Sequence, residues 1–138
     1  KKMCAVSCYV VQRMIDEDED AQKDGMLFLV RCPKGARKWN MQMARYQADV
    51  LRNAGPYRMA AFHVVEVTSG FRVVVNILRV FLGSLRHRIK VHPGDKEDTL
   101  RRLEEFGMGM DVVPSDIGGN FVVDHEAWLS AALKAEES

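Results

Sequence analysis

The residues with the clearest potential for chemistry form one short segment, Cys32-Pro-Lys-Gly-Ala-Arg37. Cys32 ends an apolar run of the kind that forms a buried strand, and a loop containing Gly35 leads from it into a predicted helix. Backbone N–H groups of such a loop, the helix N-terminus and Arg37 would favour a thiolate and bind an anion. The segment therefore predicts either a nucleophilic cysteine or, more simply, a small buried hydrophobic residue at a strand end.

The spacing of this segment resembles Cys-x-x-Gly-x-Arg, the active-site loop of rhodanese-type sulfurtransferases. That resemblance implies a sulfurtransferase in which Cys32 carries the sulfur. Because so short a motif arises easily by chance, we keep this function as an alternative to a binding protein without catalytic residues.

A second group of chemically capable residues is the acidic run from Asp16 to Asp20. Neighbouring carboxylates could hold a cation, but at a helix end or in a loop they usually form a solvated face. We favour the solvated face and expect neither a metal site nor a cofactor.

Composition restricts the class of protein. The 138 residues are 47% hydrophobic and 28% charged, which is typical of one compact domain spanning residues 1–138. A net charge of +1 gives the whole chain no preference for nucleic acid, so we expect no such partner. The odd number of cysteines, Cys4, Cys8 and Cys32, favours free thiols and a cytoplasmic location. A helix needs roughly 18 consecutive apolar residues to cross a bilayer, and charged residues interrupt every apolar run of this chain before that length.

Apolar periodicity predicts the elements that must position these residues. A helical repeat from Met3 to Met14 precedes the acidic run, and MLFLVRC at 26–32 predicts a strand buried on both faces. The further elements expected are a helix from Trp39 to Asn53, a strand at 62–67, a helix at 72–85, a strand at 88–92, and two helices capped by Asp95 and Asp124. This alternation indicates an α/β fold with a mainly parallel sheet of about three to five strands covered by helices.

The segment FRVVVNILRVFLGSLRHRIKVH, residues 71–92, has an unusual pattern. At helical spacing its polar positions fall on one stripe, while apolar residues cover the rest of the circumference. The stripe consists of Arg72, Asn76, Arg79, Gly83 and Arg86. Such a helix contacts protein on one side and a second core layer, a bound lipid or a membrane on another. A core helix between a sheet and a neighbouring helix is the simplest interpretation.

Short motifs surround this helix in a characteristic order. They are GPYRM at 55–59, FHVVEVTSGF at 62–71, LRVFL at 78–82, RIKVH at 88–92 and VVPSDIGG at 112–119, with DGMLFLVRCPKG at 24–35 upstream. Together they resemble the CRAL-TRIO domain, a lipid-binding family that includes the secretory-pathway phosphatidylinositol transfer proteins. The resemblance covers about residues 20–125. The chain departs from the family pattern at Tyr57, where a Glu is usual, and at Thr68 and Val80, where Pro is usual.

The resemblance implies that this is no enzyme, but a domain that binds, and transfers or senses, a phospholipid or another hydrophobic ligand. In the family the helix corresponding to 72–85 is a gate over a lipid cavity. The residues that the resemblance assigns to cavity and gate are Phe71, Val74, Val75, Leu78, Phe81 and Leu82. Candidates for contacting a lipid headgroup are Arg79, Arg86 and Arg88. A transient membrane surface is the implied partner. A further alternative is an interaction module, a degenerate CRAL-TRIO domain that serves as a scaffold for other proteins.

The N-terminal end of the chain corresponds to an internal helix of the family. The resemblance therefore implies that the family's first strand and N-terminal helical lobe are absent. An exposed sheet edge would then favour pairing of two chains into a homodimer.

Overall fold

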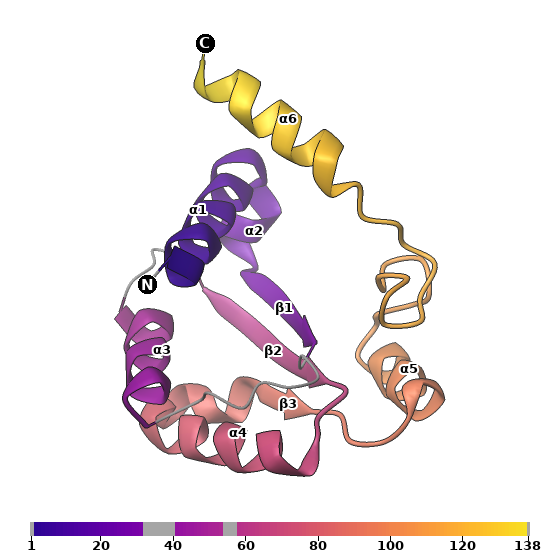
Figure 1. Ribbon diagram of the computed structural model, residues 1–138. Coiled ribbons are helices and arrows are strands. Elements are labelled where there is room, and N and C mark those ends of the chain that lie inside the picture. Colours follow the sequence, from indigo (N-terminus) through magenta and orange to yellow (C-terminus); the bar gives the residue numbers. More distant parts are fainter. Residues whose placement is uncertain (1, 32–40, 54–57, 138) are drawn as a thin grey trace. The chain divides into compact units, whose positions relative to one another are not determined.

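The computed structural model describes residues 2–31, 41–53 and 58–137. The chain divides into two compact units, Lys1–Gly94 and Asp95–Ser138. The described residues form six α-helices, one 3₁₀ helix and three strands (Figure 1). The first unit contains α1 (Lys2–Glu17), α2 (Glu19–Lys23), β1 (Met26–Arg31), α3 (Met41–Asn53), β2 (Met59–Val65), α4 (Ser69–Leu82), the 3₁₀ helix η1 (Gly83–Arg88) and β3 (Ile89–Val91). The second contains α5 (Lys96–Glu105) and α6 (His125–Glu136).

The three strands form one parallel sheet in the order β1-β2-β3. Phe62 of β2 lies opposite Phe28 of β1 and Ile89 of β3, and this register fixes which side chains share a face. Helices connect the parallel strands, as parallel pairing requires. The α/β class and the parallel sheet predicted from the sequence are thus confirmed.

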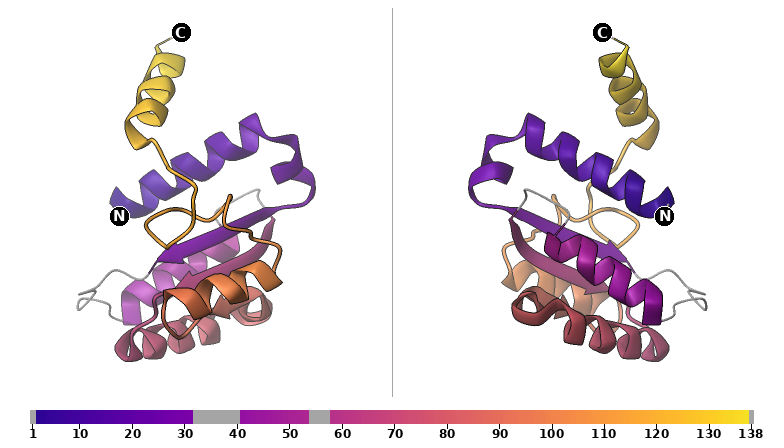
Figure 2. Two further views of the ribbon diagram at one scale, coloured as in Figure 1. Left: turned by 90° about the vertical axis from the view of Figure 1, so that its right-hand side faces the viewer. Right: turned by 90° about the vertical axis from the view of Figure 1, so that its left-hand side faces the viewer.

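One face of the sheet carries the core of the first unit. Phe28, Phe62, Val64, Ile89 and Val91 alternate toward this face along their strands. Helices α3 and α4 lie over it, whereas α1 and α2 lie on the other side of the sheet (Figure 2). The buried residues of this cluster are Ala48, Val64, Val75, Leu78, Leu82 and Ile89.

Strand β1 is less enclosed than the sequence predicts. The sequence predicts a strand at 26–32 that is buried on both faces, but Leu27 of β1 is 44% exposed and Arg31 is exposed as well, while Cys32 lies outside the described residues. The expectation is wrong because β1 is an edge strand of the described sheet and its second face is not fully covered by the helices.

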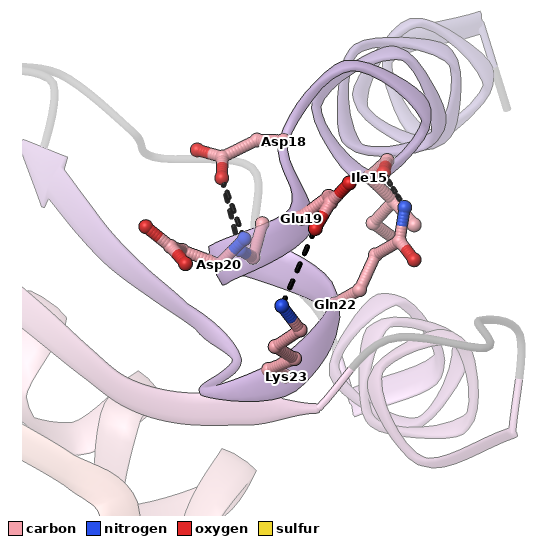
Figure 3. Close-up of polar contacts among 7 residues, drawn as sticks. Ile15, Asp18, Glu19, Asp20, Gln22 and Lys23 are labelled. Carbon is pink, nitrogen blue, oxygen red and sulfur yellow. Dashed lines mark hydrogen bonds and ion pairs between the residues drawn. The ribbon is translucent and has the colours of Figure 1, made fainter.

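The acidic run shapes the connection between α1 and α2 (Figure 3). Asp18 is the N-cap of α2, because its Oδ1 accepts hydrogen bonds from the backbone N–H groups of Asp20 at 2.8 Å and Ala21 at 3.2 Å. Glu19 pairs with Lys23 one turn later, and both side chains are exposed. These carboxylates have structural roles on a solvated face, as the sequence predicts.

The second unit contains the VVPSDIGG motif as a tight turn between its two helices. Val113 accepts a hydrogen bond from the backbone N–H of Phe121, and Pro114 accepts one from Gly119. A Cβ at Gly119 would lie 1.9 Å from the carbonyl oxygen of Val113, so only glycine fits this position. The motif therefore maintains a close backbone approach.

The caps of α5 and α6 follow the prediction. Asp95 accepts a hydrogen bond from the backbone N–H of Asp98, and Asp124 accepts one from Ala127, each at 2.9 Å.

Candidate functional site

The candidate site is built on α4, whose ends differ from the predicted 72–85. Thr68 begins the helix, because its Oγ1 accepts a hydrogen bond from the backbone N–H of Phe71 at 3.3 Å. Gly83 ends the helix, since its φ of 57° is a conformation that side chains disfavour. The helix therefore spans Ser69–Leu82, and the polar position Arg86 lies in η1.

The inner face of α4 packs on the sheet. Val75, Leu78 and Leu82 are buried and belong to the same cluster as strand residues Val64 and Ile89. The other residues predicted for the cavity and gate, Phe71, Val74 and Phe81, are half-buried. Five of these six residues, all except Val74, thus belong to the cluster or pack against it.

The three arginines predicted for a lipid headgroup do not converge on one point. Arg79 Nη2 donates to the carbonyl oxygen of Ile89 at 2.9 Å, and Arg88 Nη1 donates to that of Met59 at the start of β2. Both guanidinium groups thereby hold the helical segment to the backbone of the sheet. Arg86 is exposed, and its Nε contacts Nε2 of His87 at 3.3 Å.

The guanidinium of Arg79 keeps unused hydrogen-bonding capacity. Its Nε is buried and has no hydrogen-bond partner among the described residues. A buried donor of this kind costs free energy unless an acceptor is supplied. Arg79 thus makes a structural contact and keeps an N–H group that can donate to an anionic group.

Two further arginines, which sequence reasoning did not single out, hold the C-terminal turn of α4 from helix α3. Arg52 Nη1 donates to the carbonyl oxygen of Phe81 at 3.3 Å. The guanidinium of Arg45 lies 5.3 Å from the centre of the Phe81 ring, a cation–π contact. A spacing of seven residues places both arginines on one side of α3, but the sequence does not show that this side meets α4.

A buried histidine pair was also missed. His63 of β2 and His92, directly after β3, project to the sheet face opposite α4, with Nδ1 of His63 2.8 Å from Nε2 of His92. The two rings stack with their centroids 5.0 Å apart. Burial, with smaller contributions from His92 and Lys90, lowers the pKa of His63 from 6.5 to about 4. The site thus holds the two rings close together and disfavours the charged form of His63.

An ion pair lies at the carboxyl ends of β1 and β2. Arg31 Nε donates to Glu66 Oε2 at 2.8 Å. Glu66 has a φ of 54°, unusual for a residue with a side chain, and it ends β2 two residues before the cap of α4. This backbone turn ends the strand before Glu66, whereas the sequence predicts that it continues to residue 67.

The loop of the alternative chemistry, from Cys32 to Arg37, lies outside the described residues, as do Pro56 and Tyr57 of the GPYRM motif. The sulfurtransferase hypothesis therefore stays a prediction from the sequence. None of the helices in the described ranges is both long and apolar enough to cross a membrane.

Comparison with known protein families finds a match over most of the chain. The family model described as CRAL/TRIO domain matches residues 1–119. This range begins before the one expected from the motifs, 20–125, so it includes α1 as well as the sheet and α4. No curated protein matches the chain.

Proposed function

The chain belongs to the CRAL/TRIO domain family, and from this premise we propose that it binds a hydrophobic ligand between α4 and the sheet, with α4 as the gate. Proteins of this family generally bind hydrophobic ligands. The observation that carries the proposal is the position of α4, which covers the apolar sheet face with Val75, Leu78 and Leu82. A ligand inserted there would meet apolar side chains of both layers.

The ligand must replace the contacts that α4 makes when closed. Burial of an aliphatic side chain contributes about 2 kcal/mol, so releasing three such residues costs about 6 kcal/mol. An acyl chain regains ~0.8 kcal/mol for each buried CH₂, so about eight methylene groups offset this cost. The proposal therefore favours long-chain lipids over short-chain ones. Binding without bond cleavage needs no catalytic residue, which agrees with the non-enzymatic character typical of the family.

Solvent extraction of the purified protein, followed by mass spectrometry, tests this function directly. We expect to find a lipid in the extract. We also expect the protein to bind a fluorescent long-chain fatty acid and the extracted lipid to displace this probe. Val74→Trp, on the half-buried side of α4, should weaken probe binding. Val73→Trp is the matched control, because Val73 is 59% exposed on the same helix. Protein that yields no lipid and ignores the probe would refute the proposal.

A second candidate function is a scaffold for protein interactions, and the closed packing of α4 favours it. Leu78 is only 7% exposed and lies in the core cluster. In a scaffold this core would be permanent, so the protein would bind no probe and neither Val74→Trp nor Val73→Trp would change that. The probe experiment thus separates the two functions.

The remaining expectations on assembly are part of the proposal. The family match continues across the boundary between the two units, which supports one domain over residues 1–138. A transient membrane surface is the proposed site of ligand exchange, and the cytoplasm is the proposed location.

The proposed homodimer would form through β1, which is an edge strand of the described sheet and whose Leu27 side chain is 44% exposed. Light scattering should give the mass of a dimer that Leu27→Lys reduces to a monomer.

A further inference from the structure

The two histidines of the buried pair come from different strands. His63 is inside β2 and is 1% exposed, whereas His92 directly follows β3 and is 3% exposed. The backbone N–H of His92 also donates a hydrogen bond to the carbonyl oxygen of Val64 at 2.9 Å. Both the ring and the backbone of His92 are thus bound to β2.

The connection between the two compact units begins at this residue. Residues 92–95 belong to neither a helix nor a strand, and the first unit ends at Gly94. Gly94 has a φ of 120°, which residues with a side chain rarely adopt, and Asp95 is already the N-cap of α5. His92 is therefore the point at which this connection is attached to the sheet of the first unit.

The contact between the two rings depends on their protonation. Nδ1 of His63 lies 2.8 Å from Nε2 of His92, and in the neutral pair one of these nitrogens donates its N–H while the other accepts. One added proton places a positive charge in a buried site, which costs free energy. With a proton added to both rings, both nitrogens are donors and neither accepts, so the hydrogen bond is lost. Acid therefore opposes the contact that holds His92 on β2.

The charged side chains of the strands on this face of the sheet are cations. Lys90 of β3 lies opposite His63 in the register, and Arg31 of β1 is bound to Glu66. Helices α1 and α2 lie on this side of the sheet (Figure 2), and the charged residues described in and next to them are exposed or paired within that segment. These residues are Arg13, Asp16, Glu17, Asp18, Glu19, Asp20, Lys23 and Asp24.

We propose that the His63–His92 pair is a pH-sensitive latch, which in its neutral form fastens residues 92–95 to the sheet and on protonation releases them. Release would break both the ring contact and the backbone hydrogen bond from His92 to Val64. The second unit would then be joined to the sheet through a longer flexible segment. The latch does not depend on the proposed function, because neither histidine belongs to the residues assigned to the ligand cavity or the gate.

The size of the effect follows from proton binding. Burial, with smaller contributions from His92 and Lys90, holds the pKa of His63 at about 4 in the closed latch, whereas an exposed histidine has a pKa of 6.5. An opening that exposes His63 takes up a proton between these two pH values, so acid favours the open form. From pH 7 to pH 5 the population of the open form should increase about twentyfold.

Hydrogen exchange of the full chain, followed for single residues by nuclear magnetic resonance, tests the latch. After correction for the intrinsic effect of pH on exchange, the backbone N–H of His92 should be about twentyfold less protected at pH 5 than at pH 7. Because the opening is local, low concentrations of urea should not change this protection, whereas amides that exchange by global unfolding respond to urea. Nuclear relaxation of Gly94 should show greater mobility at pH 5.

Three variants assign the effect to the pair. His63→Asn keeps a polar atom near the position of Nδ1 but does not titrate, so the protection at position 92 should no longer depend on pH. His92→Asn tests the same contact from its other side, with the mobility of Gly94 as the measurement, and serves if His63→Asn does not fold. His125→Asn, which replaces an exposed histidine of α6, is the matched control and should behave as the wild type.

The test separates a local latch from a general loss of stability in acid. If the His92 N–H exchanges only by global unfolding at both pH values, the pair does not open by itself and the inference is overturned. A pH dependence like that of the wild type in both His63→Asn and His92→Asn would also overturn it. A lipid found in the purified protein, or its absence, has no bearing on either outcome.

Discussion

Lowering the pH from 7 to 5 should destabilise the fold through His63. This side chain is 1% exposed, and its Nδ1 lies 2.8 Å from Nε2 of His92. A proton added to His63 would bring a charge into a buried site, and His92 and Lys90 nearby further disfavour that charge. The pKa of His63 is therefore lowered to about 4, against 6.5 in an unfolded chain.

The sign follows from proton binding. Between pH 6.5 and pH 4 the unfolded chain binds a proton at His63 that the folded chain does not, so acidification favours unfolding. The stability linked to His63 is thus present above pH 6.5 and is lost as the pH falls toward 4. At pH 5 the loss is about 2 kcal/mol, and it approaches about 3 kcal/mol below pH 4. That is a large share of the 5–15 kcal/mol by which domains are typically stable.

Urea unfolding of the wild type and of His63→Asn at pH 7 and pH 5 measures this effect. Asparagine keeps a polar atom near the position of Nδ1 but does not titrate, so the variant should lose about 2 kcal/mol less than the wild type on acidification. His125→Asn, an exposed histidine of α6, should behave as the wild type. If the wild type and His63→Asn lose the same free energy of unfolding, the argument from burial is wrong.

The other predictions concern the packing of α4 and the turn of the second unit. Leu78→Ala should lower the free energy of unfolding by 2–5 kcal/mol in urea titrations, because it leaves a cavity in the core, whereas exposed Val80→Ala should change it by less than about 0.5 kcal/mol. Arg79→Met keeps the apolar stem but removes the donor to a β3 carbonyl oxygen, which should cost about 2 kcal/mol and speed release of a fluorescent fatty acid. Gly119→Ala should destabilise the chain by more than about 2 kcal/mol, seen as a lower melting temperature, since its Cβ would overlap the Val113 carbonyl. A melting temperature unchanged by Gly119→Ala would contradict the close approach.

Local signals explain which parts of the fold could be predicted. Continuous apolar runs mark β1 and β2, and the caps Asp95 and Asp124 mark helix starts, because each of these features acts within a few residues of chain. The sequence places the start of α4 three residues late, because Ser69 and Gly70, which follow the Thr68 cap, are weak helix formers. The end was predicted three residues late because LRHR continues the helical pattern while Gly83 breaks it.

The contacts of the candidate site depend on information that the sequence does not contain. His63 and His92 are 29 residues apart and meet only because Phe62 pairs with Ile89 in the parallel register. The sequence predicts a polar stripe on α4. The hydrogen bond from Arg79 to a β3 carbonyl oxygen depends on the tilt of the helix against the sheet, which the sequence does not show. Sequence periodicity indicates which side of a helix or strand is buried, but it does not show which other element packs against that side.

If α4 opens as proposed, the arginine contacts determine which half of the helix opens more readily. Arg45 and Arg52 both contact Phe81, and Arg79 is itself in the last turn, so all three contacts hold the C-terminal half of the helix. The N-terminal half is held by Phe71 and Val74, which are half-buried, and by Val75.

Opening at the N-terminal half therefore breaks none of the arginine contacts. Releasing Val75 and the buried parts of Phe71 and Val74 costs about 4 kcal/mol, which is less than release of the whole inner face together with its charged hydrogen bonds. In the proposed function the ligand would then enter at the N-terminal half of the gate, while the arginines keep the C-terminal half on the sheet.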